Sequence, residues 1–225
     1  MQITGAGISE QNDSEIVYDL IRRDIISGDL GAGSKLKVAH LCDHYAFGAA
    51  PVREALARLA GDKLVVQQSQ RGFRVREMAP EDVEDLGKVR VLLECECVRD
   101  SLKNGSDAWE ANLVAAYHKL KLAEKRPRQD NTFDELEARN RAFHDALVAA
   151  CNSPWMLELR VQIYAHHERY RYLSRRFGSG TRDTPAEHAA IYEAALRRDL
   201  KETCIQTTNH IDITTAQAIE AIKRA

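Results

Sequence analysis

Residues 50–65 read APVREALARLAGDKLV, and residues 70–75 read QRGFRV. The apolar residues of the first stretch recur at steps of three and four, which predicts a helix with one buried face. They are Val52, Ala55, Leu56 and Leu59. Pro51 suits the first turn of this helix, because its missing N–H has no helical partner there. The two β-prone runs around Arg71 and Gly72 predict a hairpin after the helix.

The residues before this stretch predict two further helices. Ser14 and Glu15 open an amphipathic run that ends at Gly28, and a short helix is expected from about Val38 to Tyr45. A tight turn at Ala46-Phe47-Gly48 separates it from the helix described above. Three helices followed by a hairpin is the layout of a winged helix-turn-helix.

The remainder of the chain is expected to be helical throughout. Apolar residues recur with helical spacing, and Gly, Pro and Asn mark the breaks between segments. The expected helices cover residues 81–103, 107–125, 132–150, about 154–176, 184–198 and 199–223. Pro80 caps the first of them. The sequence thus predicts a mainly α protein, with a winged helix-turn-helix at residues 1–78 and an all-α bundle of about six helices at residues 79–225.

Composition narrows the possible classes of protein. With 44% hydrophobic and 29% charged residues among 225, the chain is neither disordered, nor collagen-like, nor a disulfide-knotted toxin. It has no apolar run long enough to span a membrane and no signal-peptide pattern at its N-terminus. Five scattered cysteines without a CxxC motif suggest reduced thiols, so we expect a cytoplasmic protein.

The predicted helix at residues 50–62 would place basic side chains against DNA. Arg53 and Arg58 fall outside its apolar face, and an arginine can grip the O6 and N7 atoms of guanine. Arg71 at the glycine turn of Gly72 could enter a minor groove or lie along phosphates. The alternative is an ordinary solvated amphipathic helix.

The charge of the chain implies that any DNA binding depends on a local group of basic residues. The chain has a net charge of −2, and residues 1–78 hold ten basic and ten acidic side chains. Affinity for DNA would therefore rest on a local arginine cluster and on doubling by a homodimer, rather than on an excess of positive charge.

Residues 15–76 resemble the GntR family of bacterial transcription regulators. The resemblance rests on IRRDIISGDLGAGSKL, APVREALARLAGDKLV and QRGFRV, and the helical remainder resembles the FadR-type (FCD) effector domain. The resemblance implies a dimeric regulator that binds double-stranded operator DNA and releases it in response to a small molecule.

Four residues of the helical part form a candidate metal site. Asn140 and His144 share one helix face, and His188 and His210 lie on the inward stripes of two later helices. Imidazoles suit Zn²⁺, with Ni²⁺ also possible, whereas histidines buried for packing are the alternative. The resemblance favours the metal, because FadR-type domains carry Asp-x-x-x-His and two later histidines in this order; Asn140 stands where aspartate is usual. His118, His166 and His167 fit no ligand spacing and are expected to be surface or packing residues.

The resemblance also implies an effector. Arg90 matches the arginine that the family places near a ligand carboxylate, and the alternative is a surface arginine paired with Glu94. We therefore expect a regulator, in particular a repressor of a catabolic operon, that senses a small organic acid and has no enzyme activity. Two other classes stay open at this point: a metal-dependent helical hydrolase, and a structural helical protein whose wing contacts other proteins.

Overall fold

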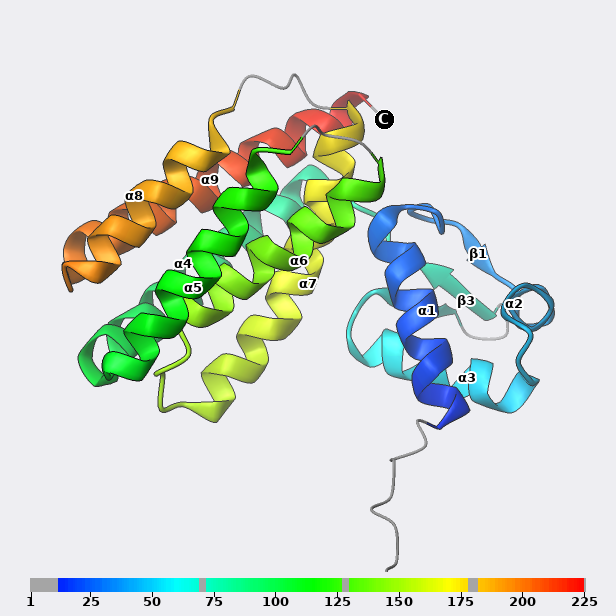
Figure 1. The fold of residues 1–225 in the computed structure, drawn as a ribbon. Coiled ribbons are helices and arrows are strands. Elements are labelled where there is room, and N and C mark those ends of the chain that lie inside the picture. The colour runs from blue at the N-terminus through cyan, green and yellow to red at the C-terminus, as the bar shows by residue number, and fades with distance from the viewer. Residues whose placement is uncertain (1–11, 69–71, 127–129, 178–181, 225) are drawn as a thin grey trace, which may run out of the picture. The chain divides into compact units, whose positions relative to one another are not determined.

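The computed structural model describes residues 12–68, 72–126, 130–177 and 182–224 of the chain. It divides into two compact units between Met78 and Ala79, each with its own core. Figure 1 shows the helices and strands of each unit. Among the described residues, no helix is both long and apolar enough to cross a membrane.

The N-terminal unit combines helices with a small sheet. Its elements are α1 (Asp13–Ser27), β1 (Lys35–Leu36), α2 (Val38–Tyr45), α3 (Ala49–Gly61), β2 (Val65–Gln68) and β3 (Gly72–Val75). The strands are antiparallel in the order β1-β3-β2. The third strand, β1, was not predicted, because two residues are too few to show an alternating pattern.

Local signals explain why these elements begin and end where they do. The side chain of Asn12 accepts a hydrogen bond from the backbone of Ser14 and caps α1, and Gly28 ends α1 with a φ of +90°. The predicted inward face of α3 is confirmed, since its four apolar residues are fully buried. They pack with α1, α2 and the sheet. The buried face of α3 leaves its opposite face directed to solvent.

The C-terminal unit is a bundle of helices, as predicted. The described residues form α4 (Pro80–Asn104), α5 (Asp107–Glu124), α6 (Asp130–Leu147), α7 (Pro154–Phe177), α8 (Thr184–Leu196) and α9 (Leu200–Arg224). In the bundle α4 packs against α7 and α9, and α5 against α6 (Figure 1). The fold class is therefore confirmed, while individual helix ends differ from the expected ones by a few residues.

Candidate metal centre and nucleic-acid interface

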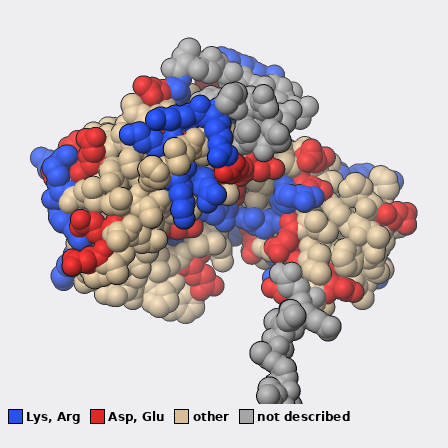
Figure 2. Space-filling model, viewed as in Figure 1, with Lys and Arg blue, Asp and Glu red and all other residues tan. Residues whose placement is uncertain are grey.

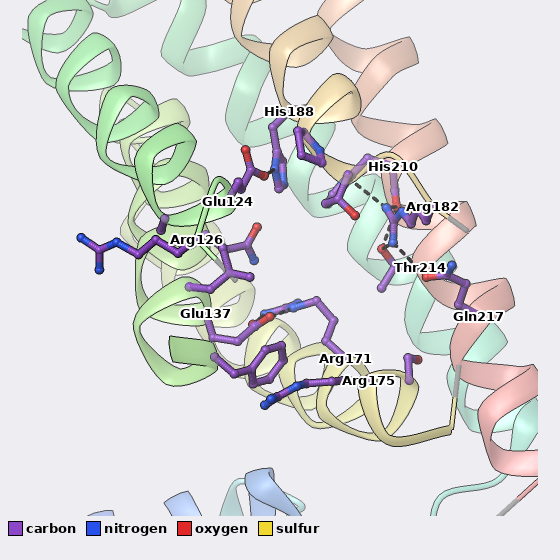
Figure 3. Close-up of a pocket in the computed structure, with 17 residues that line it drawn as sticks. Glu124, Arg126, Glu137, Arg171, Arg175, Arg182, His188, His210, Thr214 and Gln217 are labelled. Atoms are coloured by element: carbon purple, nitrogen blue, oxygen red, sulfur yellow. Dashed lines mark hydrogen bonds and ion pairs between the residues drawn. The ribbon is translucent and has the colours of Figure 1, made fainter. Parts of the chain in front are cut away.

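Three histidines from three helices meet inside the C-terminal unit. His144 of α6, His188 of α8 and His210 of α9 are all buried, and each offers a ring nitrogen within 4.8 Å of the others. Figure 3 shows His188 and His210 side by side at one end of a pocket. The ring centroids of this pair lie 4.8 Å apart. Residues 66 positions apart in the sequence thus converge on one point, as a metal site requires.

Carboxylates orient two of the three rings. Nδ1 of His188 lies 2.6 Å from Oε1 of Glu124, and Nδ1 of His210 lies 2.9 Å from Oε2 of Glu187. A proton on Nδ1 of His188 would be donated to Glu124, which leaves its Nε2 lone pair for another partner. Nδ1 of His210 lies 3.2 Å from Nη2 of Arg182 as well, so its role depends on the tautomer of the ring. Histidines that bind metals usually donate their other ring N–H to a carboxylate, a backbone carbonyl or water in this way.

Two ring nitrogens of the histidine triad have no hydrogen-bond partner among the described residues. Nε2 of His144 and Nε2 of His188 are buried and make no hydrogen bond there. A buried polar atom without a partner costs free energy, so such atoms in a native protein normally have one. The donor set of the three imidazoles fits a divalent transition metal such as Zn²⁺.

Burial favours the neutral form of His144 and His210. Desolvation is the largest cause that lowers the pKa of His144 and of His210 well below the usual value, and neighbouring histidines lower both pKa values further. Neutral imidazole is the form that ligates metals. His144 and His210 can therefore bind a cation without first losing a proton near neutral pH.

Asn140 lies one turn from His144 on α6, as the spacing predicted. Its side chain is buried, and Nδ2 donates a 2.9 Å hydrogen bond to the hydroxyl of Tyr164. The amide oxygen is the donor atom that Asn140 could offer a cation. Unlike aspartate, this oxygen brings no negative charge to the site.

Two of the three histidines, His188 and His210, open onto a cavity of about 390 Å³, whose lining does not include His144. His188, His210 and Asn140 belong to its lining, together with polar and apolar side chains of α5 to α9 (Figure 3). The volume falls in the range of small-molecule pockets.

Four arginines of the lining were not anticipated from the sequence. They are Arg126, Arg171, Arg175 and Arg182. Arg171 pairs with Glu137, with 2.8 Å between Nε and Oε2, and Arg182 pairs with Glu187. Arg182 also donates a 2.9 Å hydrogen bond to Oγ1 of Thr214. The basic run of α7 contains two of these arginines, but its helical pattern alone does not say which side chains face a cavity.

Arg90 is buried rather than exposed, so the surface alternative is wrong. It is 2% exposed on α4, its Nε lies 3.6 Å from Oε1 of Glu94, and its guanidinium stacks 4.9 Å from the ring centre of Tyr164. Desolvation lowers the pKa of Arg90. The cavity lining does not include Arg90, although Tyr164 links it to Asn140.

Three other histidines of the C-terminal unit were expected to be surface or packing residues. His118 is exposed, His166 is half-buried and His167 is buried.

In the N-terminal unit, α3 presents the arginines predicted to read DNA. Pro51 lies in the first turn of α3, and Arg53 is exposed just after it. Arg58 is also exposed, but its guanidinium lies 4.4 Å above the ring of Tyr18 on α1. Basic and acidic side chains are mixed over the face of this unit visible in Figure 2.

The wing was predicted to contribute Arg71 and Gly72. Gly72 is exposed and opens β3 with a φ of +82°, which favours glycine. Arg71 lies outside the described residues. Arg74, farther along β3, bonds to the carbonyl of Gly33 and braces the turn before β1.

Comparison with known families assigns both units. Residues 13–75 match the model described as bacterial regulatory proteins, gntR family, and residues 85–213 match the FCD domain. The families and the relatives with this domain order are DNA-binding transcription regulators and not enzymes. The comparison therefore gives no support to the hydrolase alternative.

Relatives and solved structures agree with this assignment. The chain is 38% identical to the HTH-type transcriptional regulator BphR of Paraburkholderia xenovorans (strain LB400) over 200 residues, which cover 88% of this chain and 82% of the relative. It is 32% identical to the HTH-type transcriptional repressor GlaR of Escherichia coli (strain K12) over 186 residues, 81% of this chain and 84% of the relative. The structure of E. coli McbR/YncC shares the fold, with a TM-score of 0.77 at 18% identity over 93% of this chain and 98% of that one.

The chain therefore belongs to the GntR family of bacterial transcription regulators, in the FadR-type group whose helix-turn-helix domain is followed by an FCD domain.

Proposed function

We propose that this regulator is a homodimeric repressor whose helical unit senses a small carboxylate through a bound divalent metal. The observation that carries the proposal is the buried histidine triad at the end of an arginine-lined cavity. Residues 79–225 would form the effector-binding and dimerisation domain, and residues 1–78 the DNA-binding domain.

His144, His188 and His210 would hold the metal, with Asn140 as a weaker fourth ligand. Zn²⁺ fits the imidazole donors best, and Ni²⁺ is the second choice. When bound, the metal supplies a Lewis-acidic position for an effector oxygen. Glu124 and Glu187 would fix the tautomer and orientation of the rings that they contact.

The cavity favours an anionic effector. Arginines outnumber carboxylates in its lining, and a guanidinium fork matches the geometry of a carboxylate. Arg182 would reach an effector from the α8 side of the cavity and Arg171 from α7. Arg90 does not line the cavity itself. It would act on an effector indirectly, through Tyr164, whose ring its guanidinium contacts.

Two exposed apolar side chains are candidates for the contact between the subunits of the homodimer. Leu92 on α4 is 68% exposed and Trp155 on α7 is 75% exposed, and these helices pack against each other. A second copy of the chain would cover them and would double the DNA contacts made by Arg53, Arg58, Pro51, Arg71 and Gly72.

Release of DNA would follow from a population shift. Two DNA-binding units fit two half-sites only in one arrangement of the dimer. An effector that binds another arrangement more tightly lowers operator affinity, by no more than its differential affinity for the two states. The relative GlaR is named a repressor, which supports repression, and a catabolic operon is the proposed target.

A mobility-shift titration on the DNA upstream of the gene tests this proposal. The protein is stripped with a chelator, divided, and assayed without metal or with Zn²⁺, against a panel of mono- and dicarboxylates. We expect a carboxylate to release the operator only from the Zn²⁺-loaded protein, and His188→Gln to abolish that response. His118→Gln, which changes an exposed histidine, is the matched control.

Release by a carboxylate that is equally effective without metal would overturn the metal-dependent part of the proposal. Failure of the wild-type protein to bind its upstream DNA at any salt concentration would overturn the proposed target. Binding of Zn²⁺ is measured in a separate titration with a metal indicator. Loss of DNA binding or of the carboxylate response can then be distinguished from loss of the metal.

A further inference from the structure

Two cysteines from distant parts of the chain meet between α4 and α9. Sγ of Cys95 on α4 lies 3.9 Å from the carbonyl oxygen of Cys204 on α9, and Sγ of Cys204 lies 3.9 Å from the carbonyl oxygen of Cys95. The contact is reciprocal, so both thiols lie in the groove between the same two helices. Both residues are partly exposed and both are free thiols.

The close approach of α4 and α9 explains this contact. Gly87 on α4 faces Thr215 on α9, where a Cβ atom at residue 87 would lie 2.6 Å from the Thr215 hydroxyl oxygen. A glycine at this position lets the helix backbones come closer than most side chains allow. Two turns farther along α4, the same crossing brings Cys95 against Cys204.

The surroundings make Cys95 the more reactive thiol. Its hydrogen bond with the Cys204 thiol is the largest cause that lowers the pKa of Cys95 to about 7, and Thr208, whose hydroxyl lies 3.7 Å away, lowers it further. Burial, Glu94 and Glu96 act in the opposite direction. The pKa of Cys204 is raised, chiefly by the same hydrogen bond to Cys95, while Arg99 opposes the rise. These opposite directions favour Cys95 as the attacking thiolate and Cys204 as the second thiol of the pair.

We propose that Cys95 and Cys204 form an oxidation-sensitive pair that closes to an intramolecular disulfide and joins α4 covalently to α9. The oxidant is a hydroperoxide. Both helices belong to the effector domain, and α9 carries His210, so the crosslink would restrain a helix of the candidate metal centre.

The chemistry balances in two steps. The Cys95 thiolate attacks the terminal peroxide oxygen, the O–O bond breaks, and Cys95 becomes a sulfenic acid while water or an alcohol leaves. The proton lost by the Cys95 thiol goes to the oxygen that leaves in this first step. Cys204 then attacks the sulfenic sulfur, the S–O bond breaks, and the hydroxyl group leaves as water with the proton of the Cys204 thiol. Two thiols lose two electrons in total, and one peroxide gains them.

A second cysteine pair in the same unit provides an internal comparison. Cys97 on α4 contacts the thiol of Cys151, but burial is the largest cause that raises the pKa of Cys97 to about 12. Both residues are buried. Proximity without a thiolate or access to solvent should leave this pair reduced.

Peptide mapping of the full-length protein tests the proposal. The reduced protein is treated with one equivalent of hydrogen peroxide at pH 7, quenched with N-ethylmaleimide, and digested without reductant. Trypsin gives residues 91–99 and 202–223 as separate peptides, and cleavage after Glu96 separates Cys95 from Cys97. We expect a linked Cys95–Cys204 peptide pair, lighter by two hydrogen atoms than the sum of its parts.

Serine variants and the alkylation rates of single cysteines test the same proposal. Cys95→Ser and Cys204→Ser should abolish the link, whereas Cys97→Ser should retain it. Iodoacetamide should modify Cys95 at least about ten-fold faster than Cys97 at pH 7. Maleimide on both Cys95 and Cys204 after oxidation would overturn the proposal, as would a disulfide between Cys97 and Cys151 formed first. The mapping of the wild-type protein decides the matter even if a serine variant fails to fold.

Discussion

Replacing Glu124 with glutamine should weaken metal binding without removing a metal ligand. Oε1 of Glu124 lies 2.6 Å from Nδ1 of His188, and both side chains are almost fully buried, at 7% and 2% exposed. Glutamine keeps an oxygen acceptor of similar size but loses the negative charge. A buried hydrogen bond to a charged group is worth about 1–2 kcal/mol more than a neutral one, which corresponds to roughly 5- to 30-fold in affinity.

The assay is a competition titration of Zn²⁺ between the metal-free protein and a chromophoric chelator. Glu84→Gln is the matched control, because Glu84 pairs with Lys88 at the surface of α4 and its side chain is 60% exposed. We expect Glu124→Gln to raise the Kd by that factor and Glu84→Gln to leave it unchanged. An unchanged Kd in a folded Glu124→Gln protein would refute the argument that the carboxylate orients His188.

Three further predictions address DNA binding, pH and packing. Arg53→Ala should weaken operator binding by about 1–3 kcal/mol, measured by mobility shift, with the circular dichroism melting curve unchanged; a loss of melting temperature instead would place Arg53 in the fold rather than at the DNA. Since the folded-state pKa values of His144 and His210 lie below the unfolded value of about 6.5, the unfolded chain binds more protons below that pH. The metal-free protein should therefore lose stability in urea as the pH falls from about 6.5 toward the lowered pKa values, and equal midpoints at pH 7.5 and pH 5.5 would contradict this. Gly87→Ala should lower the free energy of unfolding by about 1–3 kcal/mol because its Cβ would meet Thr215, and adding Thr215→Ala should recover part of the loss; a stable single variant would show that α4 and α9 can separate without cost.

The features that could be predicted from the sequence depend on residues that are close together in the chain. Helical spacing predicted the buried face of α3 and the neighbours Asn140 and His144 on α6, because residues three and four apart share a face wherever the helix packs. The glycine turn at Gly72 and the proline at Pro51 mark local backbone geometry in the same way. The family resemblance added the order of the later histidines, His188 and His210.

The tertiary structure decided the contacts between distant residues. Glu124 and His188 are 64 positions apart, and Cys95 and Cys204 are 109 apart, so no local pattern pairs them. The arginines that line the cavity and the burial of Arg90 depend on which sides of α7, α8 and α4 face inward. Helix packing sets these orientations through the fit of whole surfaces, and a surface charge and a buried one can occupy the same place in a helical pattern until the neighbouring helix is known.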